Sequence, residues 1–298
     1  MEGFSVRVIE TETEFESIVI KATVEENWRP GLNDAKCFFS CDPSGTIVGE
    51  VNGKPIGSVT ITKYGDDYGF VGMYIVNKEY RGKGYGLAMY MAALDRVKPR
   101  TTGGCALLER ENMYKRIGYQ SLLYGARYDF HLPTALSCFS GISEESLVNI
   151  RCIDEVDEEA LFIYDSHVFG YPRYAFLTKW LRVPGCHVHV ATDADGSVEG
   201  YVVARPTYVK EDGFRIGPLF ADSESIAEKL LMVLFKGLLL QEGSTLVICM
   251  DSFSEKAQIL AAKLQGIKVS EMVYMTTSGV LPKGCFDKWF GHTTLGIG

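Results

Sequence analysis

A strand that runs into a glycine-rich turn and then into a helix, within Phe70–Leu94, constrains the fold of this chain more than any other stretch. Residues 70–76 are apolar and mostly β-branched or aromatic, which predicts a strand. A run of alternating glycines follows: Arg81, Gly82, Lys83, Gly84, Tyr85 and Gly86. From Leu87 the apolar residues recur at helical spacing, so the turn opens a helix whose first N–H groups lack a helical partner. Those N–H groups, the helix dipole and the two basic side chains predict a phosphate or pyrophosphate site.

The spacing of the glycines separates this turn from two common phosphate-binding loops. A P-loop has a glycine five residues before its Gly-Lys pair, and Asn77 stands at that position here. A dinucleotide-binding fingerprint has G-x-G-x-x-G directly after a strand, whereas these glycines alternate behind a basic segment. Together with Val76, the turn resembles the R-G-x-G-x-G turn of the GCN5-related N-acetyltransferase (GNAT) superfamily. The alternative is a glycine-rich surface turn before an ordinary helix.

The resemblance implies acetyl-CoA as the cosubstrate, without a metal ion. In that family the central strand carries the pantetheine arm of coenzyme A along its edge, and the turn holds the pyrophosphate. The residues that the resemblance assigns to the cosubstrate are Tyr74, Ile75, Val76, Arg81, Gly82, Lys83, Gly84, Tyr85 and Gly86.

The order of the remaining elements agrees with this resemblance. Up to residue 130 the pattern predicts β-α-β-β-β-α-β-α-β, which is the GNAT order of an α/β (α+β) fold with a mixed, mostly antiparallel sheet flanked by helices. A segment with Pro133 and a polar run indicates a linker, after which the same plan recurs. We therefore expect two tandem domains: 1–130, a GNAT domain that binds acetyl-CoA and catalyses; 131–145, a linker; and 146–298, a second GNAT-like domain.

The second domain is expected to be degenerate. Where the first has its glycine turn, the second has Phe220–Ser225, which contains no glycine and places Asp222 and Glu224 where an anion would have to bind. The Y-E-K-x-G-F segment of GNAT enzymes is matched in the first domain at Tyr114–Tyr119, whereas the second has Ala262 at the tyrosine position. This domain is expected to act as a scaffold or to bind substrate.

A closer resemblance covers most of the chain. Trp28–Ala35 followed by Asp42–Gly45 is similar to the W-x-P-G-x-x-D … D-P-x-G pattern of tandem GNAT proteins of the YitH type, and Phe290–Leu295 resembles the end of that group. The resemblance implies an acetyl-CoA-dependent N-acetyltransferase that transfers acetyl to a primary amine of a small molecule or peptide by direct attack on the thioester. The alternative is a non-catalytic acyl-CoA-binding or regulatory protein, because residues 70–76 contain no carboxylate.

Three residues are expected to support the chemistry. By family resemblance, Tyr114 is the acid that protonates the coenzyme sulfur, and the alternative for it is a core aromatic. Because the central strand has no carboxylate, the candidate general bases are Glu50, at the end of a strand, and Asp67, just before the central strand, each acting through water; the alternative for each is a solvated surface acid. The residues expected to bind the acceptor lie in loops: Glu25 over the expected acceptor side, and Trp28 and Tyr171 with Pro and Gly beside them. The alternative for Trp28 is a residue of the domain's own core.

Composition sets the remaining expectations. The net charge of −8 argues against nucleic acid or an anionic membrane as a partner and is compatible with a cationic amine. The N-terminus shows no basic segment followed by an apolar core, and the eight cysteines form no C-x-x-C pair. We therefore expect a cytoplasmic protein with reduced thiols and no zinc site. Whether it forms a homo-oligomer is left open.

Overall fold

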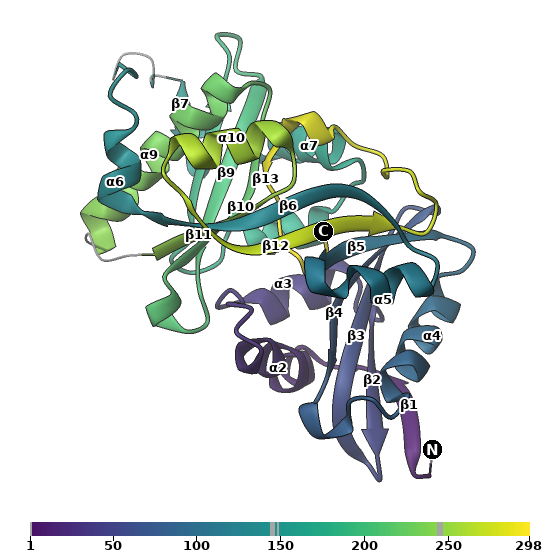
Figure 1. Ribbon diagram of the computed structural model, residues 1–298. Helices are drawn as coiled ribbons and strands as arrows, with labels where there is room; N and C mark the ends of the chain where they lie inside the picture. Colours follow the sequence, from purple (N-terminus) through teal and green to yellow (C-terminus); the bar gives the residue numbers. More distant parts are fainter. Residues whose placement is uncertain (1, 144–146, 148, 243–246) are drawn as a thin grey trace.

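The computed structural model describes residues 2–143, 147, 149–242 and 247–298. Within these residues a single mixed sheet of thirteen strands runs through both halves of the molecule (Figure 1).

The strands divide between the halves as follows. Those of the first half are β1 (Phe4–Val8), β2 (Thr46–Val51), β3 (Lys54–Tyr64), β4 (Tyr68–Val76), β5 (Thr101–Leu107) and β6 (Gln120–His131). Those of the second half are β7 (Ile150–Cys152), β8 (His187–Thr192), β9 (Val198–Pro206), β10 (Phe214–Ala221), β11 (Val247–Ser252), β12 (Ile267–Thr276) and β13 (Trp289–Gly291).

Helices cover both faces of this sheet. The first half contains α1 (Glu12–Phe15), α2 (Lys21–Glu25), α3 (Asp34–Cys41), α4 (Tyr85–Val97), α5 (Glu111–Arg116) and α6 (Leu132–Ser137). The second contains α7 (Glu158–Phe169), α8 (Tyr174–Trp180), α9 (Glu224–Glu242) and α10 (Glu255–Lys263). A π-helical segment, η1 (Glu16–Ile20), joins α1 to α2, and the short 3-10 helices are η2 (Lys78–Tyr80), η3 (Leu108–Arg110), η5 (Ile153–Glu155), η6 (Lys210–Asp212) and η7 (Phe286–Lys288).

Both halves use the same strand plan. In the first, β1 to β4 pair antiparallel in chain order and β4 then pairs parallel with β5. In the second, β7 to β10 pair antiparallel and β10 pairs parallel with β11. The expected mixed, mostly antiparallel sheet flanked by helices is confirmed, and the internal duplication is visible in its topology.

The last strands of the two halves are exchanged. The sheet order at the centre is β5-β12-β6-β11, so β12 pairs with β5 of the first half and β6 pairs with β11 of the second. Figure 1 shows β6 and β12 crossing the middle of the molecule side by side. Val273 and Met275 of β12 accordingly pack in the apolar cluster under α4, whereas Tyr128 and Phe130 of β6 pack in the cluster around α9. The strand expected to close the sheet of the first half therefore lies between β12 and β11.

The boundaries at residues 130 and 145 stay a prediction, and the strand pairing crosses them. The first part of the expected linker forms α6, and residues 144–146 lie outside the described residues. Two helices that the sequence analysis did not anticipate, α3 and α8, pack against each other between the halves, with the rings of Phe38 and Trp180 stacked at 6.0 Å.

Candidate active site

The parallel pair β4–β5 opens part of the way along β4. The two strands pair from Tyr68, opposite Thr101, to Val71, opposite Gly104. At the next positions β4 contains a bulge: the register against β3 shifts, and Met73 has a φ of 48°. In the described chain no strand pairs with the β5-facing edge of β4 beyond Val71, so the backbone N–H groups on that edge are available to a ligand.

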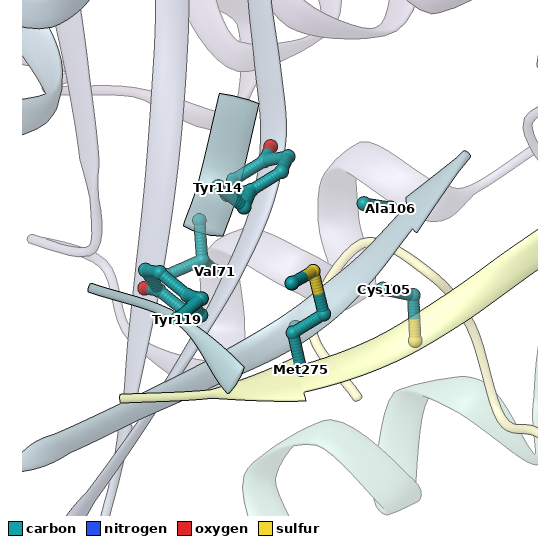
Figure 2. A pocket seen from close by; sticks show the side chains of 7 residues that line it. Val71, Cys105, Ala106, Tyr114, Tyr119 and Met275 are labelled. Atoms are coloured by element: carbon teal, nitrogen blue, oxygen red, sulfur yellow. The ribbon is translucent and has the colours of Figure 1, made fainter. Parts of the chain in front are cut away.

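A small, mostly apolar pocket lies where the two strands separate (Figure 2). It is lined by Val71, Gly104, Cys105, Ala106, Tyr114, Tyr119 and Met275. Figure 2 shows the rings of Tyr114 and Tyr119 and the side chain of Met275 directed into the same space, while the sulfur of Cys105 points away from the rings. Met275 comes from β12, so the second half supplies part of the wall of this pocket.

Of the two tyrosines that line this pocket, Tyr114 has the hydroxyl that is free to donate to a ligand. It lies on α5, its ring meets that of Tyr119 edge-on at 5.6 Å, and no described residue forms a hydrogen bond with its hydroxyl. The Tyr119 hydroxyl, by contrast, accepts from Tyr90 at 2.6 Å and lies 2.7 Å from that of Thr102. Burial, and then Tyr119, raises the pKa of Tyr114, so its phenol keeps its proton at neutral pH. The geometry makes Tyr114 a proton donor without a protein acceptor.

The glycine turn opens α4 beside the end of β4. Gly82 and Gly84 have φ values of 73° and 85°, in the left-handed region that glycine adopts without strain, and Gly84 is the N-cap of the helix. A Cβ atom on Gly86 would lie 2.8 Å from the hydroxyl of Tyr74, so a larger residue there would have to displace the Tyr74 side chain. The first N–H groups of α4 have no partner within the helix and form the donor set of an anion site.

Arg81 and Lys83 border this site from the solvent side. Arg81 donates to the carbonyl of Val76 at 2.7 Å and to the carboxylate of Glu26 at 2.7 Å, which fixes its guanidinium beside the end of β4. Lys83 donates to the carbonyl of Glu79 at 2.8 Å, and its ammonium group has two further protons to donate. Both side chains thus add positive charge next to the N-terminus of α4.

Comparison with known proteins agrees with this geometry. The model of the acetyltransferase (GNAT) family matches residues 10–119, and that of the acetyltransferase (GNAT) domain matches residues 161–291. A holothin acyltransferase of Pseudoalteromonas sp. (strain SANK 73390) is 32% identical over 213 residues, which are 72% of this chain and 68% of that protein. The chain belongs to the GNAT superfamily. Because each half matches its own GNAT model, this GNAT protein is of the tandem type.

Two further proteins support the same assignment. The uncharacterized N-acetyltransferase YitH of Bacillus subtilis (strain 168) is 24% identical over 168 residues, 56% of either chain. A crystal structure of a candidate acetyltransferase from Pyrococcus horikoshii superposes with a TM-score of 0.77 at 18% identity, covering 100% of this chain and 97% of that one. That structure shows the shared fold. GNAT proteins use an acyl-CoA cosubstrate, and the open edge of β4 beside a glycine-capped helix N-terminus fits one.

The candidate bases lie outside the pocket. Glu50 is at the end of β2 and accepts from Arg7 at 2.9 Å, near the outer edge of the sheet. Asp67 precedes β4 at the opposite end from the turn and pairs with Lys283 at 2.7 Å, which lowers the pKa of that carboxyl group. None of the seven residues that line the pocket is a carboxylate.

The three expected acceptor residues are not brought together. Glu25 is exposed at the end of α2. Trp28 is half-buried and lines a second cavity, described below. Tyr171 is buried, with its ring stacked on that of Tyr68 at 5.8 Å, and burial raises its pKa to about 12.

The second half of this GNAT protein closes the equivalent opening with its own chain. Where β10 leaves β11, Leu219 and Phe220 pair instead with β13. After β13, the backbone N–H of His292 donates to the backbone carbonyl of Asp251 on β11 at 2.7 Å. At the start of α9, Ser223 accepts from the N–H of Ile226. The expected degeneracy of this half thus has a structural basis: a strand fills the gap, and a side chain caps the helix.

Two functional candidates escaped the sequence analysis. Arg127 of β6 and Arg215 of β10 both line the second cavity and are about nine-tenths buried. Each stands in a segment whose neighbours predict a buried strand, and a charge inside such a segment is the signal that could have revealed them. In the part of the chain that the structure describes, no helix is long and apolar enough to cross a membrane, and no cluster of three metal-ligating side chains occurs.

Proposed function

We propose that this protein is an acetyl-CoA-dependent N-acetyltransferase that acts on a primary amine of a small molecule or peptide. The observation that carries the proposal is Tyr114, a protonated phenol without a partner among the described residues, in the pocket where β4 and β5 separate. The relatives named acyltransferase and N-acetyltransferase support the same reaction class.

Binding of acetyl-CoA is assigned to β4 and to the start of α4. The free N–H groups of the first turn, Arg81 and Lys83 would hold the pyrophosphate, because they combine donors with positive charge. The unpaired edge of β4 at Tyr74–Val76 would hold the pantetheine amides as a neighbouring strand would. Its backbone N–H groups would also polarise the thioester carbonyl.

The transfer itself moves one acyl group and one proton. The nitrogen of the neutral amine forms a bond to the thioester carbon, the carbon–sulfur bond breaks, and the amine loses one proton to solvent. The sulfur leaves as a thiolate and takes a proton from the hydroxyl of Tyr114, which is then reprotonated from solvent. The high pKa of Tyr114 keeps this proton available at neutral pH.

The proposal needs no carboxylate base in the pocket. An alkylamine with a pKa of about 10.4 is mostly protonated at neutral pH, so its neutral fraction limits the rate unless the site lowers that pKa. The rate is then expected to rise with pH up to the pKa of the bound amine.

The rival function is binding of acyl-CoA without catalysis, and the absence of a carboxylate from the pocket lining favours it. Release of free thiol from acetyl-CoA, measured over a panel of primary amines, separates the two. Thiol release that depends on an amine, with formation of the acetylated product, is the expected result. Calorimetric binding of acetyl-CoA without turnover on any amine would support the rival.

A further inference from the structure

A second cavity lies on the other side of β4 from Tyr114. Val71 packs in the apolar cluster under α4, whereas Met73, displaced by the bulge, packs in the large cluster between the halves and lines this cavity. The other lining residues come from the N-terminal segment, from β6, from β10 and from the C-terminal tail: Thr23, Trp28, Pro30, Asp34, Arg127, Arg215, Thr294, Leu295 and Gly296. The cavity therefore reaches β4 at its bulge, and residues of both halves line it.

Two arginines in this cavity share a single carboxylate. Arg127 donates to Asp251 through Nε at 2.8 Å and through Nη2 at 3.3 Å, and Arg215 donates to the same carboxylate at 2.6 Å. The Nη1 atom of Arg127 has its nearest acceptor, the carbonyl of Trp28, at 3.5 Å, beyond the usual range of a hydrogen bond. The N–H groups of Arg127 Nη1 are therefore available to donate to a ligand.

The other buried arginines in the described chain are paired one to one. Arg173 pairs with Asp165, and Arg205 with Asp34, which is the one carboxylate in the cavity lining. Two carboxylates that do not line the cavity, those of Asp129 and Asp212, both pair with Arg29, at 2.9 and 3.8 Å.

The pair Arg127 and Arg215 carries one positive charge more than the carboxylate it shares, whereas the neighbouring Arg29 faces two carboxylates, so the charges of the whole cluster balance. A guanidinium is matched in shape to a carboxylate, and the Nη1 donors of Arg127 are placed to bind one in the cavity.

We propose that the acceptor carries a carboxylate in addition to its primary amine, and that Arg127 binds this carboxylate in the second cavity. Arg215, held by Asp251 and by the carbonyls of Trp28 and Arg29, lies beside it and adds its charge. The inference rests on the proposed acetyl transfer and specifies its acceptor. The carboxylate accepts from the Nη1 donors of Arg127, and the amine end of the molecule then reaches β4 past Met73. The shared chemistry fits a free amino acid and the C-terminal end of a short peptide.

Matched acceptors test the proposal. We would measure kcat/KM for amino acids whose amine and carboxylate are separated by two to six bonds, for short peptides with a free primary amine, and for the carboxamide of each. Free carboxylates are expected to exceed their amides by about ten- to hundredfold, the range of one charged hydrogen bond. Better activity on the amino acids or on the peptides identifies the source of the carboxylate. Equal activity on acids and amides overturns the inference but leaves the acetyltransferase proposal standing, whereas no thiol release on any amine overturns the proposed function.

Substitutions separate ligand binding from a structural role. R127Q is expected to lower kcat/KM for the carboxylates by about ten- to hundredfold, mainly through KM, and to change that for the amides by less than about threefold. R127K, which keeps the charge, should recover part of the loss. R182Q, at an exposed arginine paired with Asp154 and Glu158, is the control. Equal losses on acids and amides, accompanied by a lower melting temperature, would show that Arg127 only ties β6 to the second half.

Discussion

Tyr114 and Tyr119 are neighbouring phenols whose hydrogen bonds differ. Tyr119 is held by Tyr90 and Thr102 and is buried, whereas the hydroxyl of Tyr114 has no partner among the described residues. Both rings line the pocket, but Tyr119 lies just before β6, where its buried hydroxyl meets Tyr90 and Thr102, while Tyr114 lies on α5 and is only partly buried. The sequence located Tyr114 through its spacing from Gly118, because that spacing is local.

Replacing Tyr114 with Phe tests its role as the acid. Tyr114→Phe keeps the ring and its packing, so the melting temperature should hardly change, and acetyl-CoA affinity should change by less than about tenfold. Turnover should fall by roughly 10²–10⁴, the usual contribution of a positioned acid. Tyr174→Phe, at an exposed tyrosine of α8, is the matched control. A folded Tyr114→Phe variant with near-normal turnover would leave Tyr114 as a packing residue only.

Replacing glycine with alanine in the turn, and separately in the middle of a helix, tests whether the turn needs glycine. Gly84→Ala forces a side chain onto a φ of 85° and should destabilise the protein by roughly 1–2 kcal/mol and weaken acetyl-CoA binding. Gly237→Ala, inside α9 where an added Cβ would meet no atom within 4 Å, should stabilise it by about 1 kcal/mol. Thermal melting and calorimetry of both variants measure these effects. A Gly84→Ala variant as stable as the parent, with unchanged binding, would contradict the turn geometry.

At the scale of the elements, local pattern was a good guide to the strands and a poor guide to their partners. The alternation of apolar residues located β6 and β12, yet each strand satisfies its pattern equally well beside β5 or beside β11. The exchange depends on contacts made only in the folded chain, such as those of Met275 with the first half. Helices α3 and α8 were missed because they lie beside Pro and Gly residues that indicate loops. The arginine pair was missed because its members are 88 residues apart, at 127 and 215.

The exchange predicts that the first half does not fold by itself. A fragment of residues 1–131 lacks β12, which covers the edge of β5 and supplies Val273 and Met275 to the core under α4. An uncovered edge and an incomplete core should leave the fragment without a cooperative thermal transition. Circular dichroism measures this, and co-expression with residues 147–298 should restore a soluble complex. A fragment that melts cooperatively when produced by itself would show that β12 is dispensable.

At the scale of the whole molecule, buried charge and a buried imidazole join the two halves. Asp251 on β11 binds Arg127 and Arg215, and burial alone would raise its pKa, but the two arginines outweigh burial and hold it at about 2. His292, in the C-terminal tail, is buried with Nδ1 unpartnered among the described residues, and burial lowers its pKa to about 4. Both groups have a lower pKa in the folded than in the unfolded chain, so both make stability depend on pH in the same direction.

Acidification should therefore destabilise the protein in two steps. The unfolded chain takes up a proton at residue 292 below pH of about 6.5, whereas the folded chain does so only near 4, so stability should fall by about 3 kcal/mol between these values. The contribution of Asp251 is present above pH of about 4 and is lost as the pH falls toward 2.

The step between pH 7 and 5 isolates the histidines, because carboxyl groups titrate mostly below it. His189 on β8, whose pKa burial also lowers to about 4, should contribute to the same step. H292Q should be less stable than the parent at pH 7, through lost packing against Trp289, but its melting temperature should depend less on pH. H189Q should flatten the curve in the same way, and the double variant should flatten it most. A double variant with the pH dependence of the parent would show that neither imidazole is held neutral by the fold.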